Sequence, residues 1–402
     1  MANPTLTAAP RKVEEIAAPS ASRRLLSLDA LRGLTIAFMI MVNNPGGPGA
    51  WREMDHSPWN GMTATDLVFP GFLFIVGITT VFSIEARLAR GATRAQLAKH
   101  IIQRAVILFG LGIVIHGFPY YHLAHLRIYG VLQRIAICYL VVGLFYLVDK
   151  RVWTKVLLLA IVLVGYWGLV RWVPVPGAGV PGRDVAFLDR NQNIVAWVDR
   201  QLMPGHLYED APTYDARDPE GLLSDIPAIG TTLIGLLIGL WLRSRRTIST
   251  KTLGLVAAAA ACMAAGYFWS IWFPLNKKMW TSSFVLASAG WSLALLALTW
   301  WAVEQKGWGK TETGKALLWP WLVFGANAIT AYAISEWLHG VFNLITFHAG
   351  GKLIDPEQWV YLHSFMRITD SGWRALAYCL IYTAICFIPI WALYRKKIFI
   401  KI

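Results

Sequence analysis

Long apolar segments, separated by short polar and basic stretches, make up most of the chain after residue 24. An α-helix needs about 20 residues to cross roughly 30 Å of hydrocarbon, and ten segments fit that length. Their apolar residues run on without the alternation that the strands of a membrane barrel require. The pattern predicts an all-α polytopic membrane protein with about ten transmembrane helices. These are expected at residues 25–43, 64–86, 99–117, 127–148, 155–173, 225–242, 252–272, 282–304, 315–338 and 374–394.

The composition agrees with a membrane protein. Of 402 residues, 56% are hydrophobic and only 15% are charged, and the mean hydropathy is +0.48. A soluble domain is about 25% charged, so a soluble globular or a disordered protein is excluded. The four cysteines all lie in apolar segments, where cysteine behaves as a small hydrophobe. Neither a disulfide framework nor a CxxC metal site is therefore expected.

The net charge of +14 raises the alternative of nucleic-acid binding. The positions of the basic residues argue against it, because most lie in short segments that fall on one side of the expected membrane. Short basic loops stay in the cytoplasm, and ten helices then place both termini there as well. Residues 1–22 are expected to be a disordered cytoplasmic tail, and residues 23–398 a single transmembrane domain.

Three long loops fall on the opposite, periplasmic face, at residues 44–63, 174–224 and 339–373. Loops of this length exceed what a mere connection needs. We expect them to form a cap over an outward-facing cavity. In the sixth helix, Gly235 and Gly239 make a GxxxG pattern, which offers a homodimer contact as one alternative.

Ionisable residues inside membrane helices are costly and indicate function by default. Asp29 and Arg32 lie three apart in the first helix and so share one face. They form either an interfacial ion pair or, through Arg32, a site for an anionic ligand that enters from the cytoplasm. Arg104 and the basic segment 87–99 are further cations on that side.

Other polar residues lie nearer the outer side. Asp66 begins the second helix, and Arg127 and Arg134 are expected in the first two turns of the fourth. A pair between Asp66 and Arg134 is the simplest interpretation; alternatively, the arginines bind phosphate or orient a loop. Asn327 and Glu336 in the ninth helix are expected to form hydrogen bonds between helices.

The loop after the first helix carries the strongest candidate for chemistry. A Gly- and Pro-rich stretch follows Asn43, and His56 then stands between an acid and a hydroxyl, flanked by tryptophans. Histidine can accept and return a proton near neutral pH, although an aromatic-belt surface histidine is the alternative. The glycines lack the order of a nucleotide-binding loop. No HxxxH or HExxH pair exists, so no metal is expected.

The combined motifs resemble the heparan-α-glucosaminide N-acetyltransferase family of transmembrane acetyltransferases. They are SLDALRGLTIAFMIMVNNPGG, HSPWNGMTATDLVFPGFLFIVG, RIYGVLQRIAICYLVV, DPEGLLSDIPAIGTTLIGLLIG, PLNKKMWTSSFVL and FGANAITAYAISEWL. They occur in the family's order over residues 24–345. The resemblance implies that residues 23–398 form an acyltransferase domain that moves acetyl from cytoplasmic acetyl-CoA to the amine of a terminal glucosamine across the membrane.

The resemblance also assigns residues. The family's essential histidine matches His56, and the asparagine that closes the first helix matches Asn43. Arg32 and Arg104 become candidates for the phosphates of acetyl-CoA, with Arg127 and Arg134 as further candidates. Lys277 and Lys278 occupy family-like positions on the outer side, where contact with an acidic glycan is an alternative.

Partners and rival functions follow from the same comparison. The chain lacks the large luminal domain of the lysosomal member, so it resembles a bacterial relative in the inner membrane, surrounded by lipid. The expected acceptor is then glucosamine, a short amino sugar oligosaccharide or an envelope glycan. One rival is an amino sugar transporter without chemistry, and another is O-acetylation of an envelope glycan.

Overall fold

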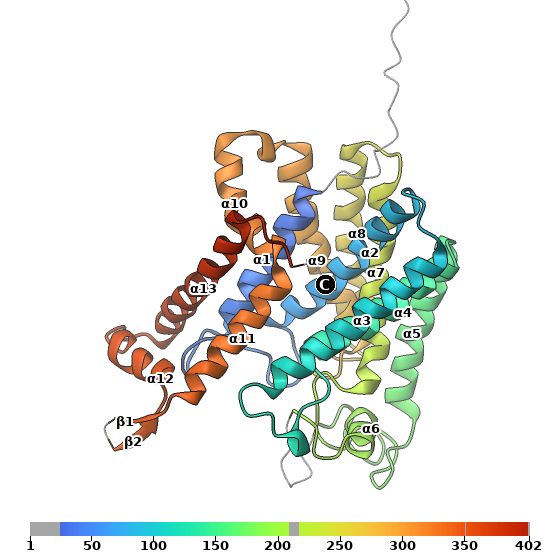
Figure 1. Ribbon diagram of the computed structural model, residues 1–402. Helices are drawn as coiled ribbons and strands as arrows, with labels where there is room; N and C mark the ends of the chain where they lie inside the picture. Colours follow the sequence, from blue (N-terminus) through green and yellow to red (C-terminus); the bar gives the residue numbers. More distant parts are fainter. Residues whose placement is uncertain (1–24, 209–216, 350, 401–402) are drawn as a thin grey trace, which may run out of the picture.

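A computed structural model describes residues 25–208, 217–349 and 351–400; the expected tail at residues 1–22 lies outside these ranges. Within them, nine helices are long and apolar enough to cross a membrane, and one bent helix pair makes a tenth span. The prediction of an all-α protein with about ten transmembrane helices is therefore confirmed. Figure 1 shows these helices side by side in one bundle.

The elements are as follows. The longer helices are α1 (Leu26–Asn43), α2 (Val68–Leu88), α3 (Arg94–Gly117), α4 (Val131–Val148), α5 (Val152–Trp172), α7 (Asp225–Arg243), α8 (Ile248–Trp269), α9 (Ser282–Trp300), α10 (Glu312–Ala326), α11 (Ala328–Leu344) and α13 (Ser371–Arg395). Short helices are α6 (Ile194–Leu202) and α12 (Pro356–Val360). Single turns are η1 (Arg52–Met54), η2 (Thr65–Leu67), η3 (Leu123–His125), η4 (Leu222–Ser224), η5 (Trp301–Gln305), η6 (Trp308–Lys310) and η7 (Tyr361–Phe365). Strands β1 (Phe347–Ala349) and β2 (Lys352–Ile354) form an antiparallel hairpin with Phe347 opposite Ile354.

Helices α1, α2, α7 and α9 form the centre of the bundle. About two thirds of each is buried, whereas α5 and α8 bury only 17% and present apolar side chains outward. A helix that is apolar all round is buried or faces lipid. The outer helices therefore supply the lipid-facing surface.

Helices α2 and α7 pack with their backbones nearly in contact. A Cβ atom added to Gly235 would lie 2.0 Å from the carbonyl oxygen of Phe74, and one added to Gly77 would lie 2.0 Å from that of Thr232. Gly239 likewise faces Ile78. Small residues permit such close approach. The homodimer contact suggested for Gly235 and Gly239 was wrong, because this face packs inside the chain.

The ninth span is broken rather than continuous, which corrects the expected helix at 315–338. Helices α10 and α11 meet at Asn327 with a bend of 75°. Asn327 has a non-helical backbone, φ −131° and ψ 45°. Broken membrane helices are tolerated where the backbone is buried or lines a cavity.

Helix starts also differ from prediction by up to five residues. Helix α3 begins at Arg94, five residues earlier than expected, because Thr93 and Gln96 form a capping box. Helix α4 begins at Val131, so Arg127 lies in the preceding loop and not in the first turns of the fourth helix.

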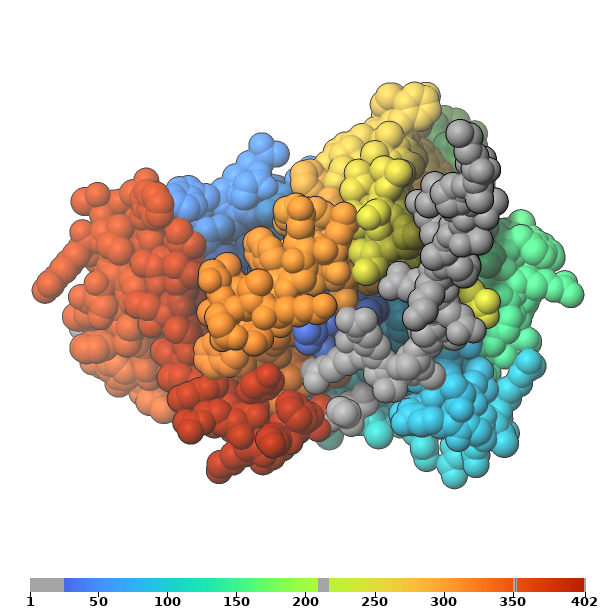
Figure 2. Space-filling view, turned by 90° about the horizontal axis from the view of Figure 1, so that it is seen from above, coloured from blue at the N-terminus to red at the C-terminus, as the bar shows by residue number. Residues whose placement is uncertain are grey.

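Two faces result from this order of helices. The basic face carries the short connections 89–93, 244–247 and 306–311, and the segment after α13. Figure 2, viewed from above, shows this face. The opposite face carries His56 and the described loop residues 118–130, 173–208, 217–221, 345–349 and 351–370, and is called the His56 face below. The loop expected at 174–224 contains α6 and that expected at 339–373 contains β1, β2 and α12.

Candidate functional site

His56 lies in the loop between η1 and η2 and forms a short contact with the first turn of the second span. Its Nδ1 atom is 2.7 Å from Oδ1 of Asp66. The His56 side chain is 44% exposed, whereas that of Asp66 is 1% exposed. A buried carboxylate that accepts the Nδ1 proton holds the imidazole in the tautomer whose Nε2 carries the lone pair. The pair can therefore present a base to a ligand on the His56 face.

The loop itself fixes the position of Asp66. Its Oδ2 accepts hydrogen bonds from the backbone N–H of Ser57 and of Thr63, each at 3.1 Å, and from the Thr63 hydroxyl at 3.2 Å. The Ser57 hydroxyl in turn donates to the carbonyl of Asn60. One carboxylate thus organises the whole turn around His56. The expected pair between Asp66 and Arg134 was wrong, because Asp66 is bound within this loop.

Lys277 approaches His56 from the connection between α8 and α9. Its Nζ lies 3.2 Å from Nε2 and 3.3 Å from Nδ1 of the imidazole. Burial lowers the pKa of Lys277, while Glu220 and Asp66 oppose that shift. The neighbouring Lys278 instead donates to the carbonyl of Pro58 at 3.1 Å. The two lysines therefore have different surroundings, and Lys277 is the one at the imidazole.

Asn43, the last residue of α1, meets Glu336 in the middle of α11. The Asn43 side chain interacts with the carboxylate of Glu336. Asn44, the next residue, is buried and donates from its side chain to the carbonyl of Ile40. The structure places Asn43 beside Glu336, and its role at His56 stays a prediction.

A cavity of about 390 Å³ lies between α1, α2, α3, α4 and α11. It is lined by Arg32, Ile36, Met39, Phe72, Ile75, Val76, Thr79, Ser83, Arg87, His100, Arg104, Leu108, Val131, Leu132, Ile135, Gly325, Ala326, Ala328, Ile329, Tyr332 and Ile400. We call it the arginine cavity. Its cations come from the turns of α1, α2 and α3 nearest the basic face, and apolar side chains line its middle. Asn43 continues the lining face of α1, and Glu336 lies one turn beyond Tyr332, so the cavity points from the basic face towards this pair.

Arg32 and Arg104 differ in how they are held in this cavity. Arg32 donates from Nη1 to Asp29 at 3.1 Å, so the expected ion pair exists while Arg32 also lines the cavity. The Arg104 guanidinium lies 4.9 Å from the ring centre of Tyr139. Its buried Nε has no hydrogen-bond partner among the described residues. A buried donor without a partner is costly, which makes Arg104 suited to an anionic ligand.

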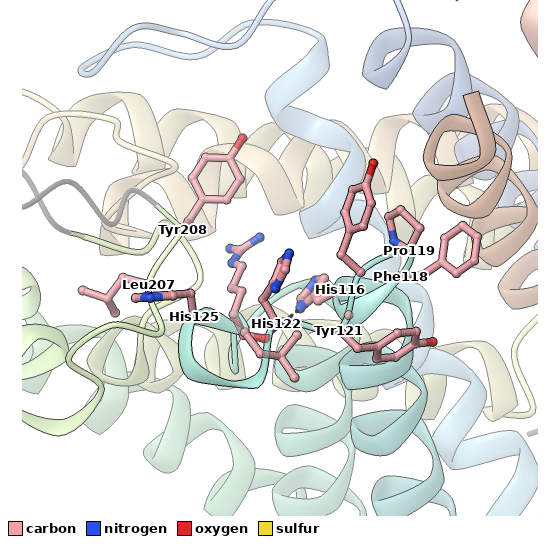
Figure 3. A pocket seen from close by; sticks show the side chains of 12 residues that line it. His116, Phe118, Pro119, Tyr121, His122, His125, Leu207 and Tyr208 are labelled. Carbon is pink, nitrogen blue, oxygen red and sulfur yellow. Dashed lines mark hydrogen bonds between the residues drawn. The ribbon is translucent and has the colours of Figure 1, made fainter. Parts of the chain in front are cut away.

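A second cavity, of about 440 Å³, opens on the His56 face (Figure 3). It is lined by His116, Gly117, Phe118, Pro119, Tyr120, Tyr121, His122, His125, Leu126, Arg127, Leu207 and Tyr208. We call it the ring-lined cavity. In Figure 3, Leu207 and Tyr208 approach from one side, and Phe118 and Pro119 from the other. Aromatic rings that carry a polar group can pack against the face of a sugar ring and form hydrogen bonds with its hydroxyl groups.

Arg127 and Arg134 hold the chain that precedes α7. Arg127 donates to Asp218 at 2.9 and 2.6 Å and to Glu220 at 2.5 Å. Arg134 is fully buried and donates from Nε to Asp225 at 2.7 Å. Both arginines thus orient a loop, as the alternative interpretation held. Their predicted contact with acetyl-CoA stays a prediction, and neither Arg134 nor Arg127 lines the arginine cavity.

The charge of Glu220 interacts both with Arg127, which holds this loop, and with Lys277, which lies beside the imidazole. Sequence reasoning missed Glu220 and Asp218. The acidic run Asp218-Pro219-Glu220 was the available signal, but it lies inside a long loop. Among the described residues, no cluster of three or more His, Cys, Asp or Glu side chains fits a metal ion.

Comparisons with known proteins give one consistent relationship. The family model described as heparan-alpha-glucosaminide N-acetyltransferase, catalytic, matches residues 24–174. The heparan-alpha-glucosaminide N-acetyltransferase of Homo sapiens is 29% identical over 430 residues, which cover 94% of this chain and 60% of the human protein. The Mus musculus protein of the same name is 29% identical over 434 residues, covering 95% and 61%. The chain thus spans about three fifths of the length of these relatives.

Proposed function

The chain is a relative of the heparan-α-glucosaminide N-acetyltransferases, and on that premise we propose that it is a transmembrane acetyltransferase. It transfers an acetyl group from acetyl-CoA, bound from the cytoplasm, to the amine of a glucosamine-type sugar on the opposite face. The observation that carries the proposal is the contact of His56 with buried Asp66, which leaves Nε2 as a base on the acceptor side.

The acceptor needs this base because an amino sugar carries an ammonium group that must lose a proton before it attacks. His56 takes that proton at Nε2, and Asp66 stabilises the imidazolium that forms. The side-chain nitrogen of Lys277 already lies 3.2 Å from Nε2. This supports a site that accommodates an amine beside the imidazole.

The donor fits the arginine cavity. Its phosphates meet Arg32, Arg87 and Arg104 near the basic face, where fixed cations replace water. The pantetheine arm then runs along the apolar middle. From Arg32 to Asn43 the helix rises about 16 Å at 1.5 Å per residue, which suits an extended arm that ends near the outer face.

The transfer step is direct. The free amine attacks the thioester carbonyl carbon, a C–N bond forms, and the oxygen becomes an oxyanion. The C–S bond then breaks, the CoA thiolate takes the proton that His56 holds, and the new amide nitrogen releases its remaining extra proton to water. The base is thereby regenerated, and one proton leaves overall. Lys277 is placed to stabilise the oxyanion, and Asn43 remains a second candidate donor. An acetyl-histidine route would use the same residues in two steps.

The acceptor approaches from the His56 face. The ring-lined cavity presents His122, Tyr121 and Tyr208 to sugar rings. Arg127 also lines it, and the charge of Glu220 interacts with both Arg127 and Lys277. These features support a glucosamine-type sugar or a short glycan as acceptor.

The decisive assay uses purified protein in lipid nanodiscs with acetyl-labelled acetyl-CoA and glucosamine. The proposal expects N-acetylated sugar and one free CoA thiol for each amide formed. An alkali-labile ester on the sugar would indicate O-acetylation instead. Movement of glucosamine into proteoliposomes without any acetylated product would indicate a transporter and contradict the proposal.

A further inference from the structure

The chain turns back sharply after α13. Lys397 adopts a left-handed backbone conformation, with φ 57°, and the N–H of Ile398 donates to the carbonyl of Leu393 at 2.9 Å. The rings of Tyr394 and Phe399 then pack edge to face, 6.1 Å apart. These contacts close the end of the helix and redirect the chain. In Figure 1 the red chain after α13 runs back towards the middle of the bundle.

Asn327 holds the returning chain through both ends of its side-chain amide. Its Nδ2 donates to the carbonyl of Ile398 at 3.0 Å, and its Oδ1 accepts from the N–H of Ile400 at 2.9 Å. Asn327 is 1% exposed and lies at the 75° break between α10 and α11. We expected hydrogen bonds between helices here, whereas the amide binds irregular backbone. An irregular chain within a membrane bundle needs such partners.

Both sides of this contact line the arginine cavity. Ile400 is one of its lining residues, as are Ala326 and Ala328 on either side of Asn327. Ile400 is 47% exposed, so its side chain is available to a ligand. Arg32 and Arg104 line the same cavity. The break and the end of the returning segment therefore belong to the lining of the same cavity as these cations.

We propose that Ile400, at the end of the returning segment Lys396–Ile400, forms a wall of the donor site and that Asn327 is the positioning residue that holds this segment there. The ligand class is a pantetheine-linked nucleotide, whose apolar arm packs against Ile400. This inference rests on the proposed function in one respect, the identity of the donor as acetyl-CoA. It explains why a buried polar side chain lies at the break of a membrane span.

Three variants separate the effect of the Asn327 hydrogen bonds from that of the Ile400 side chain. Asn327→Ala removes both hydrogen bonds, and Ile400→Pro removes the N–H donor without changing Asn327. Ile400→Ala keeps the N–H and shortens the wall side chain. Each is expected to raise the KM for acetyl-CoA, by about 10-fold for the Asn327 variant, since two net hydrogen bonds are lost. The kcat should change by less than about twofold, because the reacting atoms lie at the other end of the cavity.

Combining these variants tests whether their effects on the KM for acetyl-CoA come from the same contact. A merely structural role of Asn327 would not produce this dependence. Combining Asn327→Ala with Ile400→Pro should raise the KM no further than Asn327→Ala alone, because both remove the same contact. Asn327→Asp keeps the acceptor for Ile400 and should give an intermediate KM. Equal falls in kcat and in thermal stability, with the KM unchanged, would overturn the proposal.

Thiol labelling tests the wall directly. Ile400→Cys and Ile398→Cys are made as a matched pair in membranes, with the wild type as the blank for its own four cysteines. Added CoA should slow labelling at position 400 but not at position 398, which does not line the cavity. If CoA binds the wild type, binds Arg104→Gln weakly and still leaves position 400 unprotected, the wall is refuted while the proposed donor site stands. If CoA does not bind the wild type, the proposed function fails and the inference fails with it.

Discussion

Nδ1 of His56 lies 2.7 Å from Oδ1 of Asp66, so an exposed imidazole is oriented by a buried carboxylate ten residues later in the chain. The backbone of Ser57 and Thr63 holds the other carboxylate oxygen. Under the proposed function the two nitrogens of the ring have different tasks: Nδ1 fixes the orientation, and Nε2 faces the ligand.

Asp66→Asn should therefore lower kcat by at least about 100-fold while acetyl-CoA binding persists, because the amide no longer fixes the tautomer. Steady-state acetyl transfer and equilibrium CoA binding, measured on the same folded sample, check this. A kcat close to that of the wild type would mean that Asp66 only shapes the loop.

Lys277 and Lys278 form a natural matched pair. Lys277→Met removes the amine group beside His56 and should lower kcat by about 100- to 1,000-fold, on the scale of removing one donor to an oxyanion. Lys278→Met loses only a contact with the carbonyl of Pro58 and should retain most of the activity. Equal losses in both variants would argue for general attraction of an acidic acceptor rather than a role at the imidazole.

Arg104 should set the affinity for the donor. Arg104→Gln is expected to raise the KM for acetyl-CoA by about 10-fold or more, since a charge-assisted contact to phosphate is lost. Arg94→Gln, on the same helix but outside the cavity, is the control. Dephospho-CoA competition with both proteins would show which phosphate Arg104 contacts. An unchanged KM in Arg104→Gln would move the donor phosphates elsewhere.

Asp199 on α6 predicts a pH dependence of stability. Burial raises the pKa of Asp199 from 3.8 to about 7. The folded state thus favours the protonated acid, and a penalty appears as pH rises from about 4 and is complete above about 7. Asp199→Asn should unfold at a higher temperature than the wild type, by a margin that grows between pH 5 and pH 7 and then stays constant.

Thermal unfolding in detergent at several pH values measures this margin. Asp184→Asn serves as the control, because hydrogen bonds from Arg183 and Val180 hold the pKa of Asp184 at about 2. Its margin over the wild type should not change in the same range. A margin for Asp199→Asn that is independent of pH would contradict the raised pKa.

Much of the fold could be predicted because hydrophobic length and basic loops dominate it. The resemblance carried by the motifs also holds, as the comparisons confirm. The break at Asn327 was missed because no proline stands there and a lone asparagine in an apolar segment looks like an ordinary polar contact. The early start of α3 was readable from Thr93 and Gln96, a capping box at the correct spacing, but Arg94 and Lys99 made the segment look like a loop.

In the candidate site, too, local contacts could be predicted from the sequence and long-range contacts could not. His56 could be singled out because its motif is local, and its role stays a prediction. Asp66 was identified as a candidate but given the wrong partner. Charge alone favoured Arg134, whereas the loop brings His56 next to Asp66. Glu220 depends on how a fifty-residue loop folds back, and no short spacing encodes that. The contact of Asn327 with Ile400 joins positions 73 residues apart and needs the three-dimensional structure.

The most direct measurement of the central claim is the rate of acetyl transfer by His56→Ala, made alongside CoA binding and thermal unfolding of the same sample. The exposed His348→Ala on the same face is the control. The account predicts that His56→Ala folds and binds CoA as the wild type does but transfers acetyl at least about 100-fold more slowly, while His348→Ala stays active. Normal turnover by a folded His56→Ala protein would contradict the account.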